Sequence, residues 1–340
     1  IYSEYYHNAH TFFGYYDITP FSKDDKCIIF IRTKGDKADI CLMEVDSKNT
    51  RVIGHTNLWN WQQGCRLRWV SDDGSISFND IRDNHYCNVW KNVKTKQEIV
   101  HNYPIYDISF DESLAATLDF ERLGLLRPGY GYRCLNIPKD KLSDQALSLI
   151  DIKSGRIIKT FSLSEIRDFV KSNVSIQDCY INHVSFSPYG KKLLFFFIEI
   201  IGSYHKASLL VYDYEKDKLY LLDGNNKASH YVWKDADTII CTSQSPDKKW
   251  GYYVYSIDKG TKTLMGENIL IVDGHPSIFR ENGIITDSYP DRKGFQRLYK
   301  IEDISNLELE TLVEIYSVPV KEVEKRTDLH PRLSHKEDMI

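Results

Sequence analysis

The sequence predicts an all-β fold, a β-propeller, because a unit of four short strands recurs along its 340 residues. The clearest copy starts with an apolar alternation over residues 181–186. A Ser-Pro-Tyr-Gly turn and a second apolar run, residues 191–197, follow and indicate a β-hairpin. Strands at residues 208–213 and 218–222 complete an antiparallel meander.

The first turn of this unit recurs at seven positions, which are Ser22, Ser71, Asp111, Ser187, Lys234, Phe279 and Ser334. Most successive positions are about 40–55 residues apart, and one interval of about 76 residues fits a blade plus an insertion. We therefore predict a single propeller domain over residues 1–340 with seven blade positions. The seventh is incomplete, because the sequence ends just past its first turn. Either the chain is cut short there, or residues 1–6 supply part of that blade.

Two segments depart from the strand pattern. An insertion at about residues 123–145, in the third blade after its second strand, contains Pro and Gly and predicts an irregular loop. Such a loop serves either a ligand or no function beyond connection. Ser162, followed three residues later by Glu165, predicts the start of a short helix at about residues 163–171. We expect this helix to pack against the side of the propeller.

Composition limits the classes of function. The formal net charge of −4 provides no global basic field for nucleic acid, and no apolar run is long enough to cross a bilayer. The seven Cys, an odd number without paired spacing, predict free and mostly buried thiols. These features favour a cytoplasmic location, and a periplasmic one would require removal of a signal segment before Ile1. Nothing in the sequence sets the oligomeric state.

Four histidines stand four residues before the turn in successive blades, and they are His183, His230, His275 and His330. Asp107 holds the same place in the third blade. First strands line the central channel of a propeller, so we expect these groups to meet near one mouth. Neutral imidazoles bind divalent ions or act as bases near neutral pH. The alternative is that each His is structural and bonds the backbone of the neighbouring blade.

Three arginines stand near the ends of the second strands in the first three blades, and they are Arg32, Arg82 and Arg122. Hairpin topology brings these ends to the same mouth as the histidines. Guanidinium groups match carboxylates, so an acidic oligosaccharide or polysaccharide is the predicted ligand. Tyr16 and Trp61 would stack on its sugar rings. The alternative is that the arginines form ion pairs with nearby acids and that the aromatic residues belong to the core.

The chain resembles the oligogalacturonate lyases, which are seven-bladed propellers related to the TolB-type repeat. Residues 227–233, Lys-Ala-Ser-His-Tyr-Val-Trp, look like the Cys-Thr-His-Glu-Phe-Trp segment whose His binds manganese in that family. Residues 328–331, Asp-Leu-His-Pro, look like its His-Pro-His-Pro segment, which supplies further metal ligands. Asn182-His183 with Pro188-Tyr189 looks like its Gly-His and Arg-Pro-Tyr positions. The resemblance implies a manganese site at His230 and His330, with His275 and Asp328 as further candidates.

The chain also departs from that family. A Gln ligand of the family falls at about Lys325, its lyase base near Ile198, and its catalytic Arg at Ser187. We name His183 and His205 as candidate bases, with Glu199 as another group that could take this place.

Three functions follow from these patterns. The leading one is a carbohydrate-active propeller that binds an acidic saccharide and, as a metal-dependent lyase, cleaves it by β-elimination at a uronate. The alternative is a non-catalytic sugar-binding or scaffold protein in polysaccharide metabolism. A third, glycosyl transfer or hydrolysis, requires a pair of carboxylates, for which Asp17 and Asp107 are the candidates.

Overall fold

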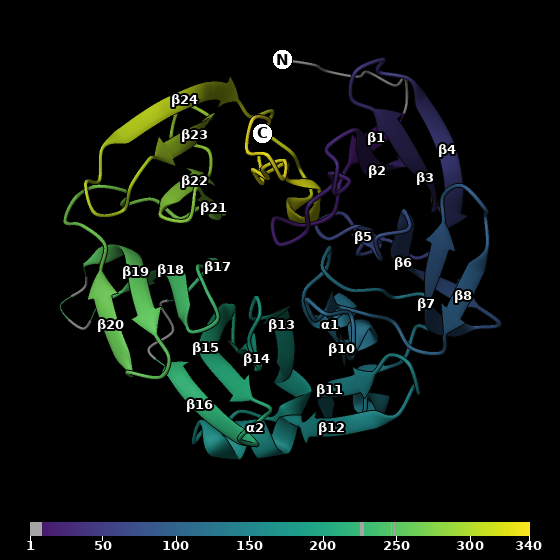
Figure 1. Cartoon of the computed structure of the whole chain (residues 1–340). Coiled ribbons are helices and arrows are strands. Elements are labelled where there is room, and N and C mark those ends of the chain that lie inside the picture. Colours follow the sequence, from purple (N-terminus) through teal and green to yellow (C-terminus); the bar gives the residue numbers. More distant parts are fainter. Residues whose placement is uncertain (1–8, 225–227, 246, 248) are drawn as a thin grey trace. The chain divides into compact units, whose positions relative to one another are not determined.

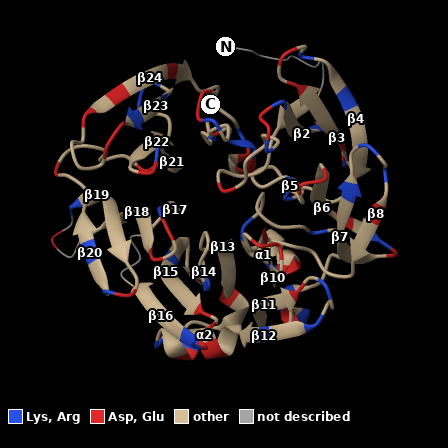
Figure 2. Cartoon of the chain, viewed as in Figure 1, with Lys and Arg blue, Asp and Glu red and all other residues tan. Residues whose placement is uncertain are grey.

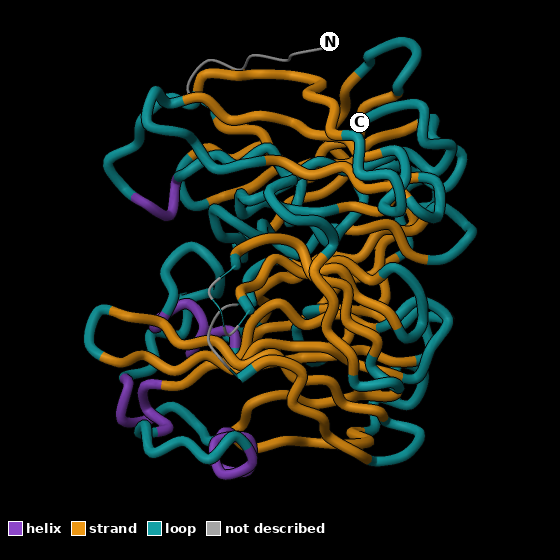
Figure 3. The backbone as a smooth tube through the Cα atoms, turned by 90° about the vertical axis from the view of Figure 1, so that its left-hand side faces the viewer, coloured by secondary structure: helices purple, strands orange, loops and turns teal. Residues whose placement is uncertain are grey.

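A computed structural model describes residues 9–224, 228–245, 247 and 249–340. Its strands form six four-stranded antiparallel sheets, and within each sheet neighbouring strands are consecutive in the chain (Figure 1). This is the blade of a β-propeller, so the predicted all-β propeller fold is confirmed. Strands are the main regular element of the described chain, and the helices are short (Figure 3).

The chain divides into two compact units. The first unit consists of Ile1–Ile105, Phe120–Pro138 and Arg332–Ile340. Its two blades are made of the strands β1 (His10–Phe12), β2 (Cys27–Lys34), β3 (Lys37–Glu44), β4 (Thr50–Thr56), β5 (Arg68–Val70), β6 (Ser75–Arg82), β7 (His85–Asn92) and β8 (Glu98–His101).

The second unit consists of Tyr106–Asp119 and Lys139–Pro331 and holds four blades. The first two comprise β9 (Asp107–Ile108), β10 (Leu114–Leu118), β11 (Gln145–Asp151), β12 (Ile157–Ser162), β13 (Cys179–Phe186), β14 (Lys192–Ile201), β15 (Tyr204–Asp213) and β16 (Lys218–Asp223). The other two comprise β17 (Tyr231–Trp233), β18 (Thr238–Gln244), β19 (Trp250–Ser256), β20 (Thr261–Leu264), β21 (Ser277–Phe279), β22 (Gly283–Asp287), β23 (Phe295–Ile301) and β24 (Leu309–Tyr316).

Apolar faces of neighbouring blades form the core inside each unit. In the first unit, Ile29 and Leu42 of one blade pack in one buried cluster with Ile76 and Val89 of the next. In the second unit, equivalent clusters join β14 and β15 to β18 and β19, and β18 and β19 to β22 and β23. Inside each unit, these blades therefore cover the apolar faces of their neighbours, which is how a propeller buries sheets that are apolar on both sides.

The insertion after β10 is more ordered than the sequence predicts. It begins with the helix α1 (Phe120–Leu126) and ends with a 3-10 turn, η1 (Lys139–Lys141). The carboxylate of Glu121, buried in α1, pairs with Arg133 at 2.9 Å and accepts the backbone N–H of Ile137 at 3.0 Å. The expectation of a wholly irregular loop is therefore wrong, because Glu121 ties the insertion back onto its own first turn.

The second helix, α2 (Leu163–Phe169), matches the prediction. The hydroxyl of Ser162 accepts the backbone N–H of Glu165, and the carboxylate of Glu165 accepts the backbone N–H of Ser162. This reciprocal capping box satisfies two N–H groups that the first helical turn leaves without partners. A further 3-10 turn, η2 (Ile176–Asp178), precedes β13.

The seventh blade position has its turn and no strand in the described part of the chain. After β24 come a 3-10 turn, η3 (Val323–Lys325), and a segment without regular secondary structure. At the predicted turn, Ser334 donates its backbone N–H to the carbonyl of Met339 at 3.0 Å. Residues 1–6, named above as a source of the missing blade, lie outside the described residues, as does Lys227 of the resemblance.

Several features predicted from composition can be compared with the structure. All seven Cys are free thiols, and five of them are buried. No helix in the described part of the chain combines the length and apolar character needed to cross a membrane. Basic and acidic residues are interspersed in both units (Figure 2), in keeping with the small net charge of −4.

Candidate metal centre

The four predicted histidines lie next to one another inside the second unit. Ring centroids are 5.7 Å apart between His183 and His230, 4.2 Å between His230 and His275, and 4.2 Å between His275 and His330. We call this set the imidazole row. The last three rings are buried, and His183 is half-buried. The equivalent positions of the histidines in successive blades therefore do bring them together.

Two members of the imidazole row have a backbone conformation that is uncommon outside glycine. The φ angle is 51° at His183 and 46° at His330. In β13 the pairing with β14 shifts register between Asn182 and Ser185, and His183 lies inside that irregularity. Bulges and left-handed residues cost free energy and redirect side chains, and they gather at functional sites. This backbone places His183 beside His230.

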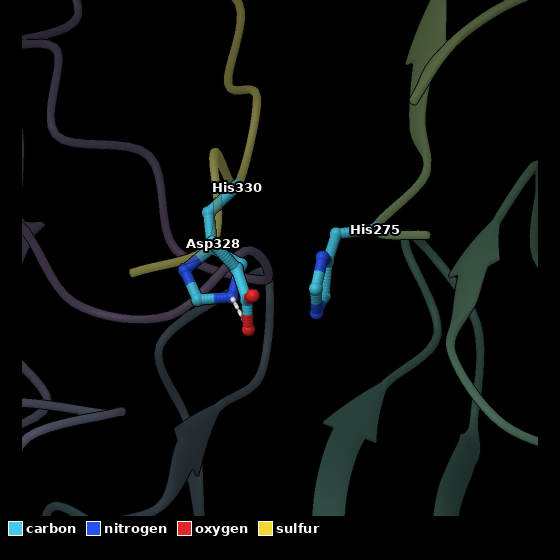
Figure 4. Close-up of side chains that lie close together, drawn as sticks. All are labelled: His275, Asp328 and His330. Carbon is cyan, nitrogen blue, oxygen red and sulfur yellow. Dashed lines mark ion pairs between the residues drawn. The ribbon is translucent and has the colours of Figure 1, made fainter. Parts of the chain in front are cut away.

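A possible metal donor group lies at one end of the row. One nitrogen of His275, one nitrogen of His330 and one carboxylate oxygen of Asp328 all lie within 4.8 Å of one another. Figure 4 shows the ring of His275 facing the Asp328 carboxylate, while Asp328 and His330 come from the same C-terminal segment. Two imidazoles and a carboxylate are a donor set that suits Mn²⁺ or Zn²⁺. The residues present therefore fit a divalent ion.

Burial sets the protonation of this donor group. It lowers the pKa of both His275 and His330 well below the ordinary imidazole value, and neighbouring imidazoles act in the same direction. Both rings are therefore neutral near pH 7, which is the form that binds a metal. Burial raises the pKa of Asp328, although a hydrogen bond from Arg326 opposes this change.

His230 lies beside the donor group and has its own carboxylate partner. Its Nδ1 is 3.2 Å from Asp273, whose oxygens also accept hydrogen bonds from Ser229 at 2.7 Å and Thr242 at 2.8 Å. Burial opposes ionisation of Asp273, but His230 and the two hydroxyls outweigh it and lower the pKa of that carboxyl. The position of His230 as a metal ligand, which the resemblance implies, stays a prediction.

Asp287 contacts two members of the donor group at once. It accepts the backbone N–H of His275 at 2.6 Å and that of His330 at 3.0 Å, and its two oxygens lie 2.9 and 3.0 Å from Nδ1 of His275. Gly274 permits this arrangement, because a Cβ at that position would lie 1.9 Å from the carbonyl oxygen of Asp287. Burial raises the pKa of Asp287.

A guanidinium group also stands at this site. Arg326 pairs with Asp328 at 2.8 Å, and its guanidinium carbon is 4.8 Å from the ring centroid of Tyr289. That ring in turn lies 5.7 Å from the ring of His275. Sequence reasoning missed Arg326, and the signal available was its position two residues before Asp328.

The other candidates of the second unit have partners of their own. Nδ1 of His205, on β15, is 2.9 Å from the hydroxyl of Tyr180. Asp107 accepts the backbone N–H of Phe186 at 2.8 Å, and this bond joins the first strands of two neighbouring blades. The buried carboxylate of Glu199 pairs with Lys206 at 2.8 Å. These contacts hold Asp107 and Glu199 in place. The predicted role of Asp107 in binding a saccharide stays a prediction, as do the catalytic roles of His205 and Glu199.

The predicted arginines all belong to the first unit. Arg32 pairs with Asp39 at 2.9 Å, and Arg82 pairs with Asp80 at 3.3 Å and Glu98 at 2.9 Å. The placement of Arg122 at the end of a second strand is wrong, because the chain has already entered α1 there and its side chain is buried. Their role in binding a saccharide stays a prediction.

The other site residues predicted from the sequence are buried or contact residues of their own unit. Tyr16 is buried, and the ring of Trp61 stacks on that of Phe12 with centroids 6.3 Å apart. Asp17 pairs with the buried Arg66 at 2.7 Å. Asp17 and Asp107 belong to different units, and each is already engaged in its own.

Comparison with known proteins identifies structural neighbours. No protein-family model and no curated protein matches the sequence. The chain is similar to an oligogalacturonate lyase in complex with manganese, with a TM-score of 0.70 and 11% identity over 97% of this chain and 85% of that one. An oligogalacturonate lyase from Vibrio parahaemolyticus gives 0.68 and 11% over 97% and 86%. The β-propeller domain of the Trilobed protease from Pyrococcus furiosus gives 0.51 and 13% over 88% and 83%. At these identities the likeness shows the fold alone, and this chain has the β-propeller fold found in the oligogalacturonate lyases.

Proposed function

We propose that this chain is a metal-dependent, carbohydrate-active propeller that cleaves an acidic oligosaccharide by β-elimination at a uronate. The observation that carries the proposal is the donor group of His275, Asp328 and His330 at one end of the imidazole row. Support comes from the fold, which is similar to that of an oligogalacturonate lyase in complex with manganese.

Each part of the site has a task in such a reaction. His275, Asp328 and His330 would hold the ion, and a bound Mn²⁺ would supply Lewis-acid polarisation of the uronate carboxylate. Arg326, beside Asp328, would pair with that carboxylate and orient the sugar ring. An imidazole would take the proton from the carbon next to the carboxylate, while the bond to the leaving glycosidic oxygen breaks. Of the two predicted bases, His183 lies in the imidazole row, where the ring of His230 stands between it and the ring of His275.

Metal analysis combined with an absorbance assay for unsaturated uronates tests this proposal. We expect the purified chain to bind one Mn²⁺ and, when given acidic oligosaccharides, to release products that carry the new double bond. A chelator should end product formation, and added Mn²⁺ should restore it. A chain that binds no divalent ion under these conditions would contradict the proposal.

The second candidate is a non-catalytic sugar-binding protein, and two positions favour it. Ser187, which takes the place of the catalytic Arg of the resembled family, is buried, and its hydroxyl accepts the backbone N–H of Lys192 at 3.2 Å in a turn. Ile198, at the place of the family's base, lies within β14 and carries no titratable group. Binding of Mn²⁺ and of acidic sugar without a rise in absorbance would support this candidate.

Arg326→Gln tests the acidic ligand. We expect this variant to bind a uronate oligosaccharide at least about tenfold more weakly, because a charge-assisted hydrogen bond in a sheltered site contributes on the order of 1.5–3 kcal/mol. Binding of a neutral oligosaccharide of equal length should change little. Titration calorimetry of both sugars measures the difference.

Two further variants complete this comparison. Arg297→Gln is the matched control, because Arg297 on β23 also pairs with carboxylates, Asp291 at 3.0 Å and Glu314 at 2.8 Å. It should bind both sugars like the wild type. Arg82→Gln tests one of the three arginines that the sequence predicts to bind the acidic sugar. If the wild type binds acidic and neutral sugars equally well, no arginine has this role and the acidic ligand is ruled out.

A further inference from the structure

We propose that Asp287 is a positioning residue that fixes both imidazoles of the candidate metal centre, an inference that rests on the proposed function. Asp287 ends β22, a strand that supplies none of the three donor residues. Its carboxylate nevertheless reaches the backbone of both His275 and His330 and the ring of His275. One buried side chain thus connects the two loops that carry the donors.

The contacts with Asp287 determine the tautomer of His275. An ionised carboxylate only accepts hydrogen bonds, so Nδ1 of His275, at 2.9 and 3.0 Å from the two oxygens, must carry the proton. Nε2 then keeps its lone pair and is the nitrogen that remains for a metal. Carboxylate partners of metal-binding histidines set the tautomer and the ring orientation in this way.

The same carboxylate holds the unusual backbone of His330. At a φ of 46° this residue lies in the left-handed region, which costs free energy for a residue other than glycine. The surrounding structure has to compensate for this cost. The hydrogen bond of 3.0 Å from the backbone N–H of His330 to Asp287 is one such restraint, and it acts on the segment that also carries Asp328.

The neighbouring pair of Asp273 and His230 provides a comparison for the contacts of Asp287 with the donor group. Asp273 contacts one imidazole of the row through Nδ1, and its other bonds are to the hydroxyls of Ser229 and Thr242. Asp287 instead contacts two residues of the donor group, which come from different loops. Of these two carboxylates, Asp287 is therefore the one placed to hold the two candidate ligands relative to each other.

The test is the variant Asp287→Asn in the full chain, with Mn²⁺ as the probe. Asn keeps the size of Asp and one accepting oxygen, but it cannot accept hydrogen bonds with both terminal atoms. We expect the affinity for Mn²⁺ in titration calorimetry to fall by about 10- to 100-fold, the usual range for loss of such a partner. Nitrogen NMR of the metal-free protein should show the proton of His275 on Nδ1 in the wild type and the loss of this preference in the variant.

Asp223→Asn serves as the matched control. Asp223, at the end of β16 in the same unit, is also buried and pairs with Lys262 at 2.7 Å, and it accepts the hydroxyl of Tyr255 at 2.7 Å. This change should lower the midpoint of unfolding without altering the Mn²⁺ affinity or the tautomer of His275. A purely structural role for Asp287 would make the two variants behave alike.

The outcomes separate this inference from the proposed function. A wild type that binds no Mn²⁺ overturns the proposed function, and the tautomer of His275 in the metal-free protein then decides the role of Asp287. A wild type that binds Mn²⁺ with an unchanged affinity in Asp287→Asn overturns the inference alone. If Asp287→Asn does not fold, the NMR of the wild type still decides, because a proton on Nε2 of His275 would overturn the inference.

Discussion

His330→Ala is expected to lower the affinity for Mn²⁺ by roughly 100-fold or more. Structural Zn²⁺ sites with four ligands bind with about 10–16 kcal/mol, so each ligand there contributes on the order of 3 kcal/mol, and every 1.4 kcal/mol is tenfold. His330 supplies one of three donors, and its ring is buried beside that of His275. Water can replace the lost ligand only in part, because the site is sheltered. Titration calorimetry with Mn²⁺ measures the loss.

Two other members of the imidazole row provide the comparison. His183→Ala should leave the Mn²⁺ affinity within about threefold, because His183 is separated from His275 by the ring of His230. His230→Ala distinguishes the two donor sets, since the family resemblance makes His230 a ligand and the geometry puts His275 in its place. If His230→Ala abolishes binding and His275→Ala does not, the donor group proposed here is wrong.

Local patterns of the sequence predict the blades well. The turn at Ser187 and the cap at Ser162 depend on residues a few positions apart, and both form as predicted. The imidazole row follows from the same periodicity, because equivalent positions in neighbouring blades lie side by side. The helix α1 escapes this reasoning, since Gly124 interrupts its pattern and Pro128 follows closely. Glu121 in this helix forms a tertiary ion pair with Arg133, a contact that no local pattern indicates.

The partners of the row could not be predicted in this way. Asp273 and Asp287 do not stand four residues before a blade turn, as the histidines do. Asp273 contacts the ring of His230, and Asp287 contacts the ring of His275. Such contacts depend on the path of loops, which no short pattern encodes. Arg32 and Arg82 recur at similar positions, and each pairs with a carboxylate on its own blade. The repeat predicts where these side chains start, while their role in binding a saccharide stays a prediction.

Gly274→Ala is expected to destabilise the second unit by several kcal/mol and to abolish Mn²⁺ binding. The added Cβ would lie 1.9 Å from the carbonyl oxygen of Asp287, 2.8 Å from its carbonyl carbon and 2.9 Å from the hydroxyl oxygen of Thr286. Two of these atoms belong to the backbone of β22 and cannot rotate away. Overpacking in a well-packed interior costs about 1–3 kcal/mol and more where backbone must move. Denaturant unfolding and titration with Mn²⁺ measure the two effects.

The link between the two effects is the position of Asp287. If β22 moves away from the new methyl group, the hydrogen bond of 2.6 Å from the backbone N–H of His275 to Asp287 lengthens, and the ring of His275 loses its orientation. Gly54→Ala is the matched control, because a Cβ on this buried glycine of β4 would meet only side chains among its nearest neighbours, Ile40 at 3.5 Å and Lys91 at 4.0 Å. That variant should lose at most about 1 kcal/mol and bind Mn²⁺ like the wild type. A folded Gly274→Ala variant with undiminished affinity would show that the close approach of Gly274 to Asp287 does not position His275.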